Sequence, residues 1–151
     1  MHASVYNPPS VFNSLQYGFS QAVEVRGGRR LLLSGQVGVD AREVCVGPGL
    51  REQTEQSFDN IARVLAAAGG DLSHVVMLRI YIAEAARDQQ EQISQVLLQR
   101  FPQQPPASSW IIVSGLSLPE WLIEIEIEAE AMLPELHQAG KAVLFEAAAG
   151  L

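Results

Sequence analysis

The chain has 151 residues, 48% of them hydrophobic, and a formal net charge of −7. This size and composition allow one domain to bury a core without disulfides or metals, and we expect a single domain. The negative charge, with no basic cluster beyond Arg26, Arg29 and Arg30, argues against nucleic acid as a partner. The single cysteine, the lack of a signal-peptide pattern and the absence of an apolar run near ~20 residues favour a cytoplasmic protein with no membrane partner.

The first part of the chain changes character near Tyr17. Residues 1–16 are polar, contain prolines and show no period, so we expect an N-terminal arm that is ordered only where something holds it. Short apolar segments at 19–25 and 30–34 then flank the pair Gly27-Gly28. Glycines between two such segments predict a hairpin of two antiparallel strands.

A helix and a strand follow. Apolar residues after Pro48-Gly49 recur at helical spacing, and the run ends at Gly69-Gly70; its members are Phe58, Ile61, Ala62, Leu65 and Ala68. A glycine pair at this point is typical of a helix C-terminus. Residues 75–82 are rich in β-branched and aromatic side chains and are apolar at nearly every position, which predicts a central strand buried on both faces.

The remaining elements complete the predicted order. Residues 85–100 lack glycine and proline and predict a second helix, which Phe101-Pro102 ends. A strand at 110–113 and a loop at 115–121 come next. With the strand described below, the order is ββαβαββ, an α+β fold in which one sheet carries two helices on one face.

Residues 123–131 read IEIEIEAEA, and only a β-strand has this period of two. Glu124, Glu126, Glu128 and Glu130 therefore share one face, roughly 6.5–7 Å apart. Like-charged neighbours raise a carboxyl pKa, which is one way to make a general acid or base. The alternative interpretation is a solvated outer face of an antiparallel sheet.

The residues after Met132 form a separate segment. Pro134 is suited to open a helix, and a weak apolar stripe follows, so we expect an appended C-terminal helix at 133–151. Gly140 keeps open the alternative of a frayed terminal segment. The chain is thus divided into an arm (1–16), a domain (17–132) and this helix.

Five stretches, in order and at matching spacing, together resemble the Rid family of reactive intermediate deaminases, also called the RidA or YjgF family. They are FSQA at 19–22, LLLSGQVGVD at 31–40, QSFDNIARVLAAAGGDLSHVV at 56–76, Pro-Pro-Ala at 105–107 and the terminal EIEIEA strand. Each is weak alone. Their combination is specific, because no common physical cause makes them occur together.

The resemblance implies a chorismate-mutase-like fold and a homotrimer, with small clefts where neighbouring subunits meet. We expect no cofactor. Active members hydrolyse enamines and imines to a keto acid and ammonia. In them an arginine after the Pro-Ala turn holds the substrate carboxylate, and backbone groups near Ser34, Gly35 and Gln36 assist it. A tyrosine in the first strand lines the cleft, and a glutamate of the last strand orients the attacking water.

This sequence departs from the family pattern at the arginine. Ser108 and Ser109 follow the Pro-Ala turn, and neither can bind a carboxylate as a guanidinium does. A charged hydrogen bond contributes about 1.5–3 kcal/mol, so its loss weakens the binding of an α-imino acid roughly 10- to 150-fold. Phe19 stands in place of the cleft tyrosine, and Ser94 in place of an asparagine of the second helix.

The other candidate residues leave alternatives open. Trp110 is suited to a ring-bearing or neutral ligand, or to packing at the trimer interface. Counting without gaps from Trp110 selects Glu124 as the water-orienting glutamate, whereas matching the EIEA string selects Glu126; we favour Glu124. Arg79 lies inside an apolar strand and needs a partner such as a glutamate, or it serves as a substitute substrate anchor.

Three functions fit these residues. The first is a trimer that lacks the arginine, binds a small metabolite between subunits, and hydrolyses it through Glu124 or Glu126 if it is catalytic. The second is an active deaminase whose anchor comes from elsewhere, for example Arg79. The third is a non-catalytic module that senses a metabolite or binds a partner. The three histidines are scattered along the chain, which predicts no metal site.

Overall fold

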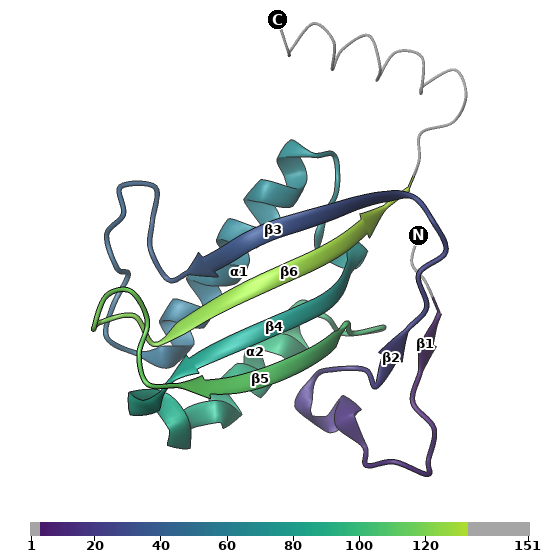
Figure 1. The fold of residues 1–151 in the computed structure, drawn as a ribbon, viewed down its shortest axis with the longest axis horizontal. Helices are drawn as coiled ribbons and strands as arrows, with labels where there is room; N and C mark the ends of the chain where they lie inside the picture. The colour runs from purple at the N-terminus through teal and green to yellow at the C-terminus, as the bar shows by residue number, and fades with distance from the viewer. Residues whose placement is uncertain (1–3, 133–151) are drawn as a thin grey trace, which may run out of the picture.

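The computed structural model describes residues 4–132, so the helix expected at 133–151 lies outside the described residues. Its main feature is a four-stranded sheet in the order β3-β6-β4-β5 (Figure 1). The strands are β3 (Arg29–Val37), β6 (Ile123–Ala131), β4 (Val75–Ala83) and β5 (Ala107–Val113). Strand β6 is antiparallel to both neighbours, whereas β4 and β5 are parallel.

Two helices cover one face of this sheet (Figure 1). They are α1 (Leu50–Ala67) and α2 (Gln90–Arg100), and the 3-10 helix η3 (Glu84–Gln89) leads into the second. Helix α1 ends as expected, because Gly69 adopts a left-handed φ of 79° and the Gly70 amide donates to the Leu65 carbonyl. The 3-10 helix η2 (Leu72–His74) connects α1 to β4. The mixed sheet with two helices confirms the α+β class.

The expected hairpin between 19–25 and 30–34 is wrong. Strand β2 (Ala22–Val23) pairs instead with β1 (Val5–Tyr6) in a separate two-stranded sheet, and the 3-10 helix η1 (Ser14–Tyr17) lies between them. Strand β3 pairs with β6 over nearly its whole length. Local glycines marked a turn correctly, but β6 offers nine alternating residues as a partner and β2 only two. The main sheet is therefore βαβαββ, not ββαβαββ.

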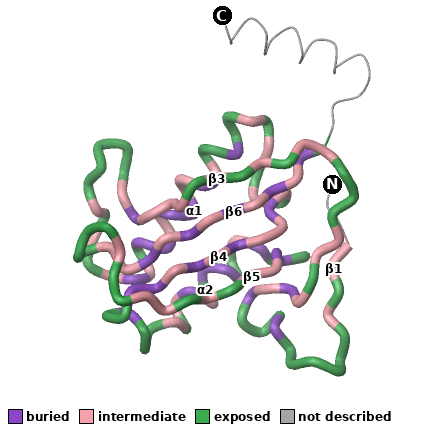
Figure 2. The backbone as a smooth tube through the Cα atoms, in the orientation of Figure 1, coloured by how far each residue is buried: buried purple, intermediate pink, exposed green. Residues whose placement is uncertain are grey.

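The core lies between the sheet and the helices. Every second residue of β6 is buried, and Figure 2 shows the alternation along this strand. The largest fully buried side chains include Ile80, Ile82, Ile123, Ile125, Ile127, Phe58, Ile61 and Ile93. The prediction that β4 is buried on both faces is wrong for the single chain. Arg79 and Tyr81 are only half-buried, on the sheet face that the helices leave open.

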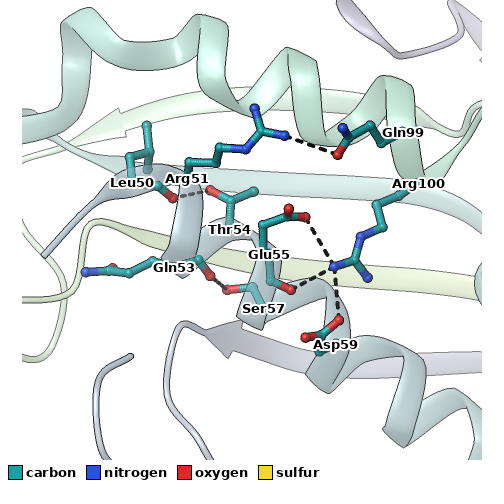
Figure 3. A network of polar contacts seen from close by, with 9 residues as sticks. All are labelled: Leu50, Arg51, Gln53, Thr54, Glu55, Ser57, Asp59, Gln99 and Arg100. Carbon is teal, nitrogen blue, oxygen red and sulfur yellow. Dashed lines mark hydrogen bonds and ion pairs between the residues drawn. The ribbon is translucent and has the colours of Figure 1, made fainter. Parts of the chain in front are cut away.

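Polar residues interrupt the buried face of α1. Gln53 is fully buried, and its amide donates to the carbonyls of Gly47 (2.8 Å) and Glu120 (3.0 Å) and accepts from the Leu122 amide (2.8 Å). One side chain of α1 thus holds both the loop that follows β3 and the loop that precedes β6. Thr54 and Ser57 are also buried and donate to carbonyls one turn earlier in the helix (Figure 3).

Charged residues join the exposed sides of the helices. Arg100 of α2 reaches the carboxylates of Glu55 (3.2 Å) and Asp59 (3.0 Å) on α1, and Arg51 of α1 donates to the Gln99 side chain of α2 (3.2 Å; Figure 3). These contacts fix α2 against α1. Both arginines are therefore occupied on the helical side of the molecule.

Candidate functional site

The candidate site residues fall into two groups at opposite edges of the main sheet. Ser34, Gly35 and Gln36 belong to β3 at one edge, and Glu124 and Glu126 lie beside them on β6. Ser108, Ser109 and Trp110 belong to β5 at the other edge. Strand β4 separates β6 from β5 (Figure 1). A single chain therefore does not bring the two groups together.

The group at β3 is built around a β-bulge. Leu33 pairs with Ile127 and Gln36 pairs with Ile125, so β3 carries one extra residue between these pairs. A bulge removes local backbone groups from the ladder and redirects neighbouring side chains. The Gln36 side-chain amide donates to the Ser34 carbonyl (3.0 Å), which closes the bulge on itself.

The absence of a side chain at Gly35 leaves room for the carboxylate of Glu124. A Cβ atom at Gly35 would lie 2.7 Å from the Cγ and 2.8 Å from the Cδ of Glu124. The Glu124 side chain therefore lies directly over the Gly35 backbone, and only glycine leaves room for it. Among the described residues, no basic side chain forms an ion pair with Glu124.

Glu126 and Glu128 are occupied by neighbours on the open sheet face. Glu126 accepts a hydrogen bond from the Tyr81 hydroxyl, and this bond raises the pKa of Tyr81. Arg79 lies 2.9 Å from Glu128 and 3.7 Å from Glu126, which confirms the ion pair expected for this arginine. Arg30 also bonds Glu128, and hydrogen bonds from Arg30 and then Arg79 lower the pKa of the Glu128 carboxyl.

The group at β5 is aromatic and uncharged. The rings of Phe19 and Trp110 lie 6.2 Å apart at 51°, and Phe12 meets Phe19 edge-on at 6.2 Å. The Trp110 indole nitrogen donates to the Ser108 hydroxyl (2.9 Å). Phe12 was not expected here, because it lies in the aperiodic arm and no sequence pattern marks it.

The N-terminal segment is fixed to the proline turn that leads into β5, and it lies near the start of that strand in Figure 1. The Ser20 amide donates to the Pro106 carbonyl (2.9 Å), and its hydroxyl donates to the Pro105 carbonyl. The buried Ser20 thereby holds the adjacent Phe19 against the proline turn. The family-like FSQA and Pro-Pro-Ala stretches are thus neighbours in space.

Ser109 and Ser94 do not join this group. Ser108 pairs in register with buried Leu78, on the helix side, whereas Ser109 pairs with Arg79, on the open face. Ser108 and Trp110 therefore share a face that Ser109 does not. Ser94 lies half-buried in α2, and no hydrogen bond joins it to the other candidate residues in the described part of the chain.

Two further findings concern the residues that the structure describes. No described helix is both long and apolar enough to cross a bilayer. Within residues 4–132, no group of three or more His, Cys, Asp and Glu side chains is placed to hold a metal ion.

Comparisons with known proteins agree with the sequence motifs and the fold. The family model described as endoribonuclease L-PSP matches residues 13–131. Protein DfrA of Myxococcus xanthus is 33% identical over 76% of this chain and 84% of its own length, and a RutC family protein of Saccharolobus solfataricus is 37% identical over 74% and 86%.

A solved structure shows the same fold. YyfB of Yersinia pestis, a Rid-family protein of unknown function, has 38% sequence identity and a TM-score of 0.82, covering 87% of this chain and all of that one. A 2-iminobutanoate/2-iminopropanoate deaminase of Dermatophagoides farinae is 41% identical over 42% of this chain and 49% of its own length. The chain therefore belongs to the Rid family, the family of the endoribonuclease L-PSP model.

Proposed function

We propose that the chain assembles as a homotrimer whose clefts bind a small metabolite and hydrolyse its C=N bond. The observation that carries the proposal is the division of the candidate site. The Gly35 and Glu124 half lies at one sheet edge and the Ser108 and Trp110 half at the other. In a ring of identical chains, a head-to-tail contact sets one edge beside the other edge of the next copy. Each such contact then makes one complete cleft.

The open face of the sheet supports assembly. Leu32 is 68% exposed and Ile111 is 36% exposed on this face of the single chain. They lie beside the ion pairs of Arg79 with Glu126 and Glu128, whose groups are only partly exposed. Neighbouring copies that pack against this face would remove its apolar groups from water.

Glu124 supplies the chemistry. Its carboxylate is free of ion pairs with described basic residues and lies over Gly35, so it can accept a hydrogen bond from water. That water adds to the imine carbon, both of its protons pass to the nitrogen in turn, and the C–N bond breaks as the C=O bond forms. The products are a carbonyl compound and ammonia. Glu126 is the weaker candidate because the Tyr81 hydroxyl already occupies it.

The cleft is a poor site for 2-imino acids. Ser108 stands where an arginine would bind the carboxylate, and Arg79 lies on the other sheet face in contact with two glutamates. Arg79 therefore does not replace the missing anchor. Two related proteins carry the name 2-iminobutanoate/2-iminopropanoate deaminase, and we expect this chain to differ from them in substrate.

Mass and turnover measurements test the proposal. Native mass spectrometry should find three chains, and freshly generated 2-aminoacrylate should be hydrolysed much more slowly than by a relative that has the arginine. Glu124→Gln, which keeps the side-chain volume, is the catalytic control. Monomers at micromolar concentration, or keto-acid release as fast as that of the arginine-bearing relative, would contradict it. Binding without turnover of any C=N compound would indicate the non-catalytic module instead.

A further inference from the structure

We infer that the preferred ligand is a flat, apolar imine without a carboxylate group, bound as its protonated iminium ion. The inference rests on the proposed function, because it needs both halves of the cleft. It names the class of substrate, which the family membership of the chain leaves open.

The β5 half offers ring faces and one neutral hydrogen-bonding group. Phe12, Phe19 and Trp110 form a continuous aromatic series, and Phe12 is 62% exposed. Because the Trp110 nitrogen already donates to Ser108, the indole has no donor left for an anionic ligand. The Ser108 hydroxyl accepts that bond and keeps its own proton to donate. This half therefore suits a planar ring and a neutral acceptor.

Among the residues that the structure describes, the arginines nearest to this part of the fold are engaged elsewhere. Arg79 lies on the opposite face of the sheet, the face that Glu124 also shares, and its charge is paired with Glu126 and Glu128. Arg100 is held by Glu55 and Asp59, and Arg51 donates to Gln95 and Gln99 on the outer side of the helices. A ligand carboxylate would lose its hydration here without gaining a charged partner, which is unfavourable.

The β3 half adds a negative charge. Glu124 is the side chain it presents over Gly35, and a carboxylate attracts an iminium ion and repels a carboxylate. Aromatic faces also attract cations through their quadrupoles. Both halves therefore favour the same ligand: a cation or a neutral molecule with a ring. Hydrolysis remains balanced, since the iminium ion and water yield a carbonyl compound and an ammonium ion.

A matched pair of stable cyclic imines tests the inference. 3,4-Dihydroisoquinoline and its 1-carboxylate have the same ring and differ only in the acid group on the imine carbon. Titration calorimetry on the full chain should give at least tenfold tighter binding of the unsubstituted imine, equal to about 1.4 kcal/mol. Tighter binding of the carboxylate would overturn the inference.

Variants assign the preference to the residues named. Ser108→Arg should reverse the preference between the two imines, because the guanidinium can bind the carboxylate. Trp110→Leu should weaken the binding of 3,4-dihydroisoquinoline by about tenfold, because the contact between the two rings is lost. Tyr6→Leu, at another exposed aromatic residue, is the control and should leave binding unchanged.

The outcomes separate the two proposals. A trimer that hydrolyses C=N bonds but prefers the carboxylate would refute the ligand class and leave the proposed function in place. Monomers would refute both, and a trimer that binds neither imine would refute the ligand class alone. Native mass spectrometry of each variant identifies any that has lost assembly, and the Ser108→Arg result decides the inference if Trp110→Leu fails to fold.

Discussion

Gln53 makes the most testable contribution to the stability of the site's framework. This fully buried side chain forms hydrogen bonds with Gly47, Glu120 and Leu122, on the loops that follow β3 and precede β6. Gln53→Leu keeps the helix propensity and nearly the volume but leaves these three backbone groups without their partner. At about 1 kcal/mol net for each bond, the loss is about 3 kcal/mol. For a chain of this size, that lowers Tm by about 6–12 °C.

Urea unfolding followed by circular dichroism, at one fixed protein concentration, measures this loss. Gln99→Leu is the matched control. Gln99 is an exposed helical glutamine that accepts one bond from Arg51, so its replacement should change stability by less than about 0.5 kcal/mol. A Gln53→Leu chain within 1 kcal/mol of the wild type would show that Gln53 does not join these loops.

Three other outcomes are expected. Gly35→Ala should reduce turnover at least about tenfold with little loss of stability, because the new methyl group displaces the flexible Glu124 carboxylate; unchanged turnover would separate Glu124 from the reaction. Ser108→Arg should raise 2-imino acid hydrolysis by about 10- to 150-fold, measured as keto-acid release, and an unchanged rate would mean that the anchor acts elsewhere. The pKa of Glu128 is lowered by Arg30 and Arg79, so its contribution to stability is present above the ordinary carboxyl pKa of 4.5 and is lost as pH falls. Glu128→Gln should therefore flatten the loss of stability below pH 4.5 in acid unfolding curves, and curves parallel to wild type would contradict the ion pairs.

Local patterns predicted the elements of this fold well. The two-residue period of β6 and the helical spacing of α1 follow from backbone geometry alone. Strand pairing did not follow from the sequence in the same way. The choice between β2 and β6 as the partner of β3 depends on which segment offers the longer ladder in three dimensions. The burial of β4 was overestimated because its open face carries Arg79 and Tyr81 among apolar neighbours.

The candidate site residues could be named from the sequence, but their arrangement in space could not. Family motifs marked both halves, yet nothing in the sequence says that they occupy opposite edges of one sheet. The bulge at β3 and the place of Phe12 also depend on contacts between distant segments. The burial of Gln53 could have been predicted from the sequence. It shares the heptad-like spacing of the buried residues Leu50, Thr54, Ser57 and Phe58. A glutamine at such a position indicates a buried hydrogen-bonding role.

Mixed trimers test most directly whether one cleft is built from two copies. Trp110→Ala and Glu124→Lys each damage one half, so each homotrimer should fail to bind 3,4-dihydroisoquinoline. In trimers assembled at random from equal amounts of both variants, an intact β5 edge meets an intact β3 edge in about a quarter of the clefts. Calorimetry of trimers whose mass is verified should therefore recover about a quarter of the wild-type sites. No recovery would contradict a cleft shared between neighbouring copies.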